Sequence, residues 1–174
     1  MTGPSLLVCR SATLNVDEAP WHLVLERATR AVRVVRLTAD QAEQWPRTPQ
    51  SGDGASVVLG IGGAAPIAYR LAVRSPLAFR LVVADARSQP PDIPDGVGAP
   101  EFPITAISTA SPRAASTRAL VGWAACTTGA FEIRTVPSWR DDTDAFVTGC
   151  LRHLHEAGLL AGPDDRGDVL ALRP

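Results

Sequence analysis

The sequence contains no lysine, and all 17 basic residues are arginine. A chain without lysine has no side chain for a Schiff base, for a cofactor aldimine or for the lysine contact of a phosphate-binding loop. Together with frequent alanine, glycine and proline, this composition is typical of a GC-rich bacterial genome, such as that of an actinobacterium. We therefore exclude lysine chemistry and expect no cofactor.

Long apolar runs and a large net charge are also missing. No apolar stretch approaches the roughly 18 residues that span a bilayer, and the first residues have neither the basic start nor the long apolar run of a signal peptide. The net charge of -1 provides no electrostatic attraction to nucleic acid or to an anionic membrane. We predict a cytoplasmic protein that binds neither nucleic acid nor membranes.

Cysteine is scarce, with Cys9, Cys126 and Cys150 far apart in the sequence. An odd number of distant cysteines argues against a disulfide framework. Cys150, His153 and His155 do not all share one face of a helix, and a fourth ligand is missing, so we predict no metal site. Cys9 fits a core thiol within a strand better than a replacement nucleophile, because no histidine is placed to activate it.

The apolar residues alternate between the spacing of strands and the spacing of helices. The predicted strands are Ser5–Cys9, Val32–Leu37, Val57–Leu59, Phe79–Ala84, Pro103–Ile107 and Phe131–Val136. The predicted helices are Ala19–Ala31, Gly63–Arg74, Ser116–Ala125 and Asp144–Leu160, with a single turn at Asp40–Trp45. This alternation predicts a single α/β domain with a mostly parallel sheet of about six strands and helices on both faces. We place the domain at residues 1–162 and a polar tail at residues 163–174.

In such sheets, ligands bind beyond the carboxyl ends of the strands. The loops expected there are residues 10–13, 60–63, 85–89, 108–113 and 137–144. Residues 55–72 combine an apolar strand, a glycine-rich turn and an apolar-faced helix, which is the outline of the nucleophile elbow of an α/β-hydrolase. Gly62 occupies the position of the attacking residue, unless the three glycines only form a tight turn before the helix.

Several segments resemble, in order, the thioesterases of polyketide and nonribosomal peptide assembly lines, both the type II editing enzymes and the terminal domains. The segments are LLVC at 6–9, GIGGAAPIAYRLA at 60–72, LVVADARSQPP at 81–91, FPITAIS at 102–108 and GWAACTTGAFEIRTVPSWR at 122–140. The resemblance covers most of the chain and implies an α/β-hydrolase fold.

The same resemblance implies that the catalytic serine and histidine are missing. The serine would fall at Gly62 and the histidine at Arg140; the acid would fall near Ser111 in the type II branch or at Asp85 in the terminal-domain branch. Glycine has no nucleophile, and arginine stays protonated near neutral pH, so the serine mechanism is expected to be absent.

Two residues remain as catalytic candidates, Asp85 and Arg140. Asp85 either orients a polar group of a ligand or caps a turn. Arg140 either holds a carboxylate or phosphate or pairs with Asp141 and Asp142 at the surface. The candidates for substrate contact are Arg10, Ser11, Ile61, Gly62, Gly63 and Trp139.

Members of this family carry a helical lid between the fourth and fifth strands, where this chain has only Arg87–Phe102. The resemblance therefore implies a reduced fold without the lid, whose exposed face would suit a partner protein or a homodimer. We expect a thioesterase-like protein without the Ser–His pair that binds an acyl or polyketide intermediate, an acyl carrier protein or a partner enzyme. The alternatives are an enzyme that catalyses a non-covalent cyclisation or rearrangement, and a structural subunit without catalysis.

Overall fold

The computed structural model describes residues 5–9, 20–29, 33–45, 56–86, 98–109 and 117–158. Its strands are β1 (Ser5–Cys9), β2 (Arg33–Leu37), β3 (Ser56–Ile61), β4 (Ala78–Ala84), β5 (Ile104–Thr109) and β6 (Phe131–Val136). Its helices are α1 (Trp21–Ala28), α2 (Ala39–Gln44), α3 (Ala65–Arg74), α4 (Thr117–Val121) and α5 (Thr143–Glu156), with short 3₁₀ turns η2 (Gly62–Ala64) and η3 (Gly122–Cys126). The predicted order of strands and helices is confirmed.

All six strands belong to one sheet in the order β2-β1-β3-β4-β5-β6, and every neighbouring pair is parallel. The side chains of β1 and β3 are buried on both faces, as expected for central strands of a parallel sheet that is covered on both sides. The prediction of a single α/β domain with about six parallel strands is confirmed.

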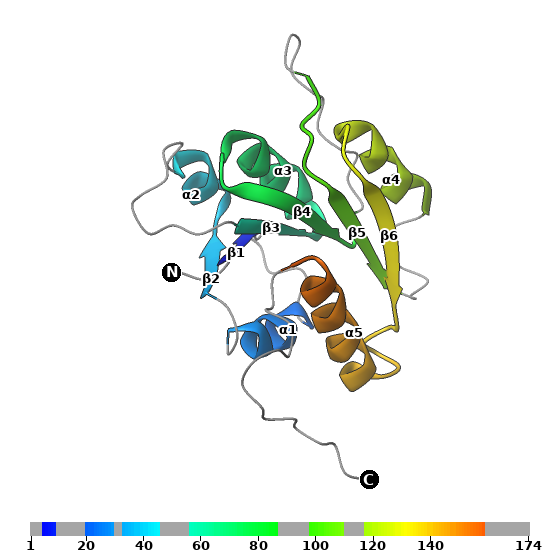
Figure 1. The fold of residues 1–174 in the computed structure, drawn as a ribbon. Helices are drawn as coiled ribbons and strands as arrows, with labels where there is room; N and C mark the ends of the chain where they lie inside the picture. The colour runs from blue at the N-terminus through cyan, green and yellow to red at the C-terminus, as the bar shows by residue number, and fades with distance from the viewer. Residues whose placement is uncertain are drawn as a thin grey trace, which may run out of the picture.

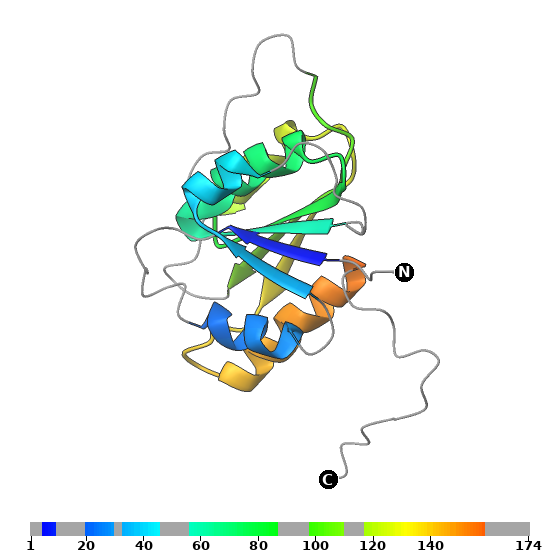
Figure 2. The same cartoon turned by 90° about the vertical axis from the view of Figure 1, so that its left-hand side faces the viewer.

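Helices cover both faces of this sheet (Figures 1 and 2). On one face, α2, α3 and the α4–η3 segment pack over a core that includes Val58, Leu81 and Trp123. On the other face, α1 and α5 lie side by side over a second core that includes Leu59 and Phe146. The sheet thus separates two apolar layers and leaves its two strand-end edges for polar groups.

Local sequence signals explain where several helices begin. Thr38 and Gln41 form a reciprocal capping box at the start of α2. At α5, Asp142 Oδ1 accepts a hydrogen bond of 2.9 Å from the amide of Ala145. Pro66 lies in the first turn of α3, where its missing N–H costs little.

Some boundaries differ from the prediction because helix ends depend on packing rather than on periodicity. α1 spans only Trp21–Ala28, and α5 ends at Glu156. The predicted helix Ser116–Ala125 is a short α-helix that tightens into the 3₁₀ turn η3. Strand β5 begins after Pro103 and continues to Thr109.

Most of the connection between β4 and β5, where the sequence predicts that the lid is missing, lies outside the described residues. Its described residues, 85–86 and 98–103, contain no helix. Within the described ranges, no helix combines the length and apolarity that crossing a membrane requires.

Candidate functional site at the carboxyl edge of the sheet

Gly62 lies at the bend between the central strand β3 and the helix α3 that follows it. Its φ is 57°, in the left-handed region that residues with a side chain rarely adopt. Two residues earlier, a Cβ added to Gly60 would lie only 2.6 Å from Ala65 Cα and from Ala68 Cβ, so glycine lets the helix approach the strand. This sharp strand–turn–helix has the geometry of a nucleophile elbow, with no side chain at its apex.

Asp85 stands next to Gly62 at the same edge. Ile61 of β3 pairs with Ala84 of β4. The residues that follow them, Gly62 and Asp85, therefore begin two bends that lie side by side. Asp85 also has a positive φ, 47°, which makes it the non-glycine residue with a left-handed backbone among the described positions. Asp tolerates this conformation better than most residues, and strained backbone of this kind is often found at functional sites.

The carboxylate of Asp85 is fixed by the neighbouring strand. Its Oδ1 accepts hydrogen bonds of 3.0 Å from both the amide and the hydroxyl of Thr109, at the end of β5. The amide of Asp85 in turn donates to the carbonyl of Ile107 at 2.9 Å. Asp85 therefore caps the end of β5, and the same contacts hold a negative charge beside Gly62.

The loop after β6 forms a tight turn around Ser138. The carbonyl of Ser138 accepts from the amides of Asp141 and Asp142, both at 3.1 Å, and its hydroxyl accepts from the amide of Arg140 at 3.3 Å. Ser138 is buried, so this turn is anchored to the body of the domain. It presents Trp139 and Arg140 beyond the carboxyl end of the last strand.

Arg140 is exposed, and its guanidinium lies 4.9 Å from the centroid of the Trp139 ring. This distance is typical of a cation–π contact. Among the described residues, no carboxylate lies within ion-pair distance of Arg140, so the pairing with Asp141 or Asp142 that the sequence allowed is not formed. The reason is local: Asp142 is turned toward α5 as its cap.

The structure separates the remaining candidates into three groups. Arg10 and Ser11 lie outside the described residues, as does Ser111. Ile61 is only 2% exposed and packs into the core beneath α1 and α5, so its side chain belongs to the interior. Gly63 is exposed, and a Cβ at this position would meet nothing within 4 Å.

The three cysteines are buried and reduced. Burial raises the pKa of Cys9 from 9.0 to about 12, and it raises the pKa of Cys126 as well. Burial also raises the pKa of Cys150, and the charge of Asp85 adds to this effect. The protonated thiols are poor nucleophiles, which fits the interpretation of Cys9 as a core residue.

Cys150, His153 and His155 lie close together in the sequence on α5. Within the part of the chain that the structure describes, no group of three or more His, Cys, Asp and Glu residues is arranged to hold a metal ion. His153 faces Glu156 instead, with Nδ1 and Oε2 3.2 Å apart.

Thr109 is the residue of this edge that sequence reasoning did not single out. It lies in the predicted 108–113 loop, and nothing local in the sequence marks it as the partner of Asp85. The contact arises because β4 and β5 are neighbours in register, with Ala84 opposite Ile107. The one indication in the sequence is that Thr109 is a polar residue close to the end of the predicted strand that follows Asp85 in the sequence.

Comparisons with known proteins show which solved structures share this architecture. No family model and no curated protein sequence matches the chain. Among solved structures, RedJ, a thioesterase from the prodiginine biosynthetic pathway in Streptomyces coelicolor, matches 90% of this chain over 88% of its own length, with a TM-score of 0.62 and 16% identity.

Two other solved structures give the same result. The Vlm2 thioesterase domain matches 92% of this chain over 95% of its own, with a TM-score of 0.61 and 12% identity. ClbQ from the colibactin NRPS/PKS pathway matches 90% of this chain over 98% of its own, with a TM-score of 0.55 and 11% identity. At these identities the likeness shows the fold. The chain is therefore a protein with the α/β fold of thioesterases from natural-product pathways.

Proposed function

We propose that this chain is a thioesterase-like protein of bacterial natural-product biosynthesis that binds an acyl or polyketide group without hydrolysing it. The observation that carries the proposal is Gly62, which occupies the apex of an elbow-shaped bend with a φ of 57°. An attacking serine would sit on such a bend, and glycine supplies the bend without the hydroxyl.

The surrounding residues support a binding role better than acyl transfer. A serine mechanism needs a neutral imidazole as base, and the loop that would carry it presents Arg140, whose guanidinium donates hydrogen bonds and has no acceptor atom. A guanidinium stacked on Trp139 and exposed at the strand ends suits a carboxylate or phosphate on the ligand. Exposed Gly63 leaves room for an acyl chain to approach the backbone at the bend.

Neighbours in fold support the ligand class. The Vlm2 thioesterase domain has been solved with a dodecadepsipeptide bound, and RedJ with a polyethylene glycol molecule in its active site. We infer that an acyl or peptidyl chain lies at the corresponding carboxyl edge here, presented either free or on a carrier protein.

The first experiment measures hydrolysis and covalent capture. The purified protein is incubated with a series of acyl thioesters, and free thiol and protein mass are followed together. We expect no release above the uncatalysed rate and no acyl adduct, because the bend has no nucleophile. Rapid turnover, or an acylated protein, would overturn the proposal.

The second experiment measures binding. A non-hydrolysable acyl thioether is titrated calorimetrically into the wild-type protein, into Arg140→Ala and into Arg152→Ala, whose arginine is exposed on α5. We expect Arg140→Ala to weaken binding by about tenfold, the loss of one charge-assisted contact, and Arg152→Ala to leave it unchanged. Absence of binding to the wild-type protein would favour the structural subunit.

A second candidate function rests on Asp85. Two hydrogen bonds and a left-handed backbone hold its carboxylate next to Gly62. Strained backbone of this kind is often found at functional sites. A fixed carboxylate can act as a general base in a cyclisation or rearrangement that forms no covalent enzyme intermediate. In that case Asp85→Asn would abolish conversion of a reactive polyketide substrate but leave its binding intact; unchanged conversion would exclude this function.

A further inference from the structure

The strand β6 forms one end of the sheet and pairs with β5 on its inner side (Figure 1). Residues 117–130 and 137–158, which flank β6 in the sequence, all belong to the described part of the chain, and no strand within that part pairs with the outer side of β6. Residues 131–134 are half-buried and Thr135 is exposed, whereas the central strands β1 and β3 are buried throughout. An edge strand of this kind is a template for pairing with another strand.

Alternate residues of β6 direct their backbone groups away from the sheet. The carbonyl of Ala130 accepts a hydrogen bond of 2.9 Å from the amide of Ile104 in β5. Because successive residues of a strand turn their N–H and C=O groups to opposite sides, Glu132 and Arg134 also bond to β5. The residues between them present these groups at the outer side, namely Phe131, Ile133 and Thr135.

The charged side chains of β6 share one face of the strand. Glu132 and Arg134 lie on the face that carries α5, where Arg134 Nη2 is 2.8 Å from Glu132 Oε2 and 3.9 Å from Glu156 Oε2. Phe131 and Ile133 lie on the other face and pack against the core beneath α3 and η3. The side chains of Glu132 and Arg134 are 37% and 42% exposed, so both reach solvent. The edge therefore carries one negative and one positive charge two residues apart.

This spacing of charges is self-complementary in an antiparallel pair. If a second copy of β6 pairs with the first about a two-fold axis at Ile133, the outward-facing Phe131 of each copy bonds to Thr135 of the other, and the two Ile133 residues bond to each other. Glu132 then lies opposite Arg134 of the second copy in a non-hydrogen-bonded pair, whose Cα atoms are about 4.5 Å apart. Opposite charges at such positions stabilise a pair of strands.

Neighbouring registers that keep the same faces together place like charges opposite one another. An axis at Glu132 would set two carboxylates opposite each other, and an axis at Arg134 would do the same with two guanidinium groups. Like charges directly opposite each other destabilise a strand pair. The charges of β6 therefore select the axis at Ile133.

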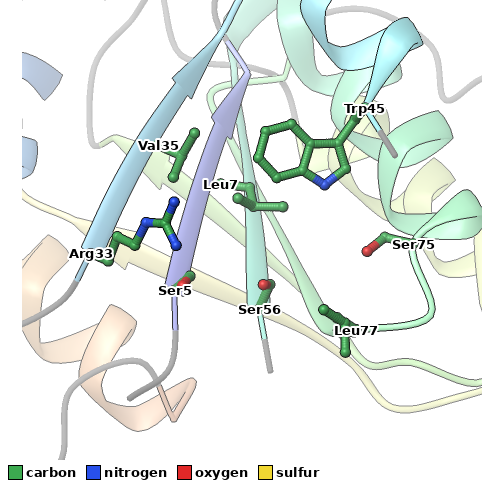
Figure 3. A pocket seen from close by; sticks show the side chains of 8 residues that line it. All are labelled: Ser5, Leu7, Arg33, Val35, Trp45, Ser56, Ser75 and Leu77. Atoms are coloured by element: carbon green, nitrogen blue, oxygen red, sulfur yellow. The ribbon is translucent and has the colours of Figure 1, made fainter. Parts of the chain in front are cut away.

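The strand at the other end of the sheet, β2, lacks such a match. Its charged residues are Arg33 and Arg36, so a second copy of β2 paired with it would bring four guanidinium groups together. The amino end of β2 also belongs to a polar row, in which Ser5, Arg33 and Ser56 lie in register across three neighbouring strands. Figure 3 shows the side chain of Arg33 directed from β2 toward β1, into the sheet rather than beyond its end. Of the two end strands, β6 is the one suited to self-association.

We propose that this chain forms a symmetric homodimer in which the β6 strands of two copies pair antiparallel about Ile133, so that the two sheets join into one continuous sheet. The contact is separate from the lid-less face that the sequence suggested for a partner, and it does not depend on the proposed function. A single pair of short strands buries less than the roughly 1,600 Å² of a standard interface. We therefore expect a weak dimer, with a dissociation constant on the order of 10–100 µM.

The first experiment measures association and locates the contact in the wild-type protein. Sedimentation equilibrium from about 10 µM to about 1 mM should show a reversible monomer–dimer equilibrium. Amide hydrogen exchange is then compared at the two ends of this range. The outward-facing amides of Phe131, Ile133 and Thr135 should exchange at least about threefold more slowly at the high concentration, because only the dimer gives them acceptors.

Charge reversal on β6 provides a matched set of variants. Glu132→Arg and Arg134→Glu each set like charges opposite one another, so each should weaken self-association by about tenfold. A one-to-one mixture of the two variants should associate again, because every pair across the two strands then joins opposite charges. Arg36→Glu, at an exposed position of β2, is the control and should leave the dissociation constant unchanged within about twofold.

Thr135→Pro tests the backbone contact without changing the ion pairs of Glu132. Thr135 is exposed and its N–H faces outward, so proline removes a hydrogen bond across the dimer and none to β5. This variant should weaken self-association by at least about fivefold. Circular dichroism and urea unfolding verify that each variant is folded, and Thr135→Pro decides the question if a charge-reversal variant is not.

Four results would overturn the proposal. The wild-type protein stays monomeric at about 1 mM; a dimer forms without slower exchange of the outward-facing amides; the mixture of the two folded charge-reversal variants does not associate; or Thr135→Pro dimerises as tightly as the wild type.

Discussion

Polar groups at the two edges of this sheet are held in different ways. At the carboxyl edge, Gly62 and Asp85 owe their positions to left-handed backbone conformations. At the amino edge, Arg33, Ser5 and Ser56 owe theirs to strand register alone. A substitution at the carboxyl edge therefore changes the energy of the backbone as well as the chemistry, whereas one at the amino edge changes mainly the chemistry.

The largest expected effect concerns reactive groups at the carboxyl edge, where β1 ends at Cys9. Burial raises the pKa of Cys9 from 9.0 to about 12. Since the thiolate is the attacking form and the folded protein keeps this thiol buried and protonated, Cys9 should react at least about tenfold more slowly in the folded protein than in the unfolded chain. Iodoacetamide labelling followed by mass spectrometry, with and without urea, measures the ratio. Fast labelling of Cys9 in the folded protein would contradict this prediction and would favour the alternative that Cys9 is a replacement nucleophile.

The next effect concerns the close approach of α3 to β3. In Gly60→Ala, the new Cβ would lie 2.6 Å from Ala65 Cα and Ala68 Cβ, so helix and strand must move apart. We expect a loss of about 1–3 kcal/mol in the free energy of unfolding, measured by urea denaturation. Gly63→Ala is the control: its Cβ meets nothing within 4 Å, and its stability should change by less than about 1 kcal/mol. Equal losses would mean that the packing at Gly60 does not determine the bend.

The contacts of Asp85 give a third comparison. Asp85→Ala removes the acceptor of both Thr109 hydrogen bonds and leaves the amide of Thr109 without it. We expect this variant to lose about 1–3 kcal/mol of stability. Asp85→Asn keeps an acceptor oxygen and a residue suited to positive φ, so it should lose less than half as much. If the two variants unfold at the same urea concentration, the carboxyl-edge contacts do not stabilise the fold.

The backbone conformation of Gly62 provides a fourth comparison between the two edges. Any L-residue with a side chain is strained at a φ of 57°, so Gly62→Ala should cost about 1–2 kcal/mol in the free energy of unfolding. Ser5→Ala, at the amino edge, is the matched substitution in an extended strand and should cost less than about 1 kcal/mol. Thermal or urea unfolding of both variants tests whether the two edges differ as proposed. A greater loss in Ser5→Ala would reverse the comparison.

The smallest expected effect is the dependence of the free energy of unfolding on pH through Glu132. Burial alone would raise the pKa of Glu132, but hydrogen bonds from Thr105 and Arg134, with the charges of Arg134 and Arg80, lower it below the ordinary 4.5. The folded state therefore favours the ionised carboxylate, and this stabilisation is complete above about pH 4.5 and is lost as the pH falls below that value.

The corresponding variant is Glu132→Gln. Because the carboxylate is more than a third exposed, we expect the variant to differ from wild type by less than about 1 kcal/mol at neutral pH, with the difference shrinking in acid. Urea denaturation across acidic and neutral buffers measures it. A difference that grows as the pH falls would contradict the sign of this shift.

Much of the fold was predictable because its signals are local. Apolar runs such as residues 6–9 mark strands, and the glycine-rich turn at residues 60–63 marks the bend between a central strand and a helix. The bend itself was confirmed at Gly62. The roles proposed for Asp85 and Arg140 stay predictions, although the structure places each beyond the carboxyl end of a strand.

Other features depended on contacts between distant parts of the chain. The partner of Asp85 was not predictable, because Thr109 is 24 residues away and becomes a neighbour only through pairing of β4 with β5. Nor was the stacking of Arg140 on Trp139, since both acidic neighbours were equally plausible partners.

The sequence by itself determined the kinds of elements, their order and the glycine at the elbow, because periodicity and backbone freedom are properties of short segments. Only the tertiary structure decided which strand ends lie side by side, and with them the Asp85–Thr109 contact and the polar row of Ser5, Arg33 and Ser56. The physical reason is that register is set by hydrogen bonding between strands that are separated along the chain by helices or by long connections.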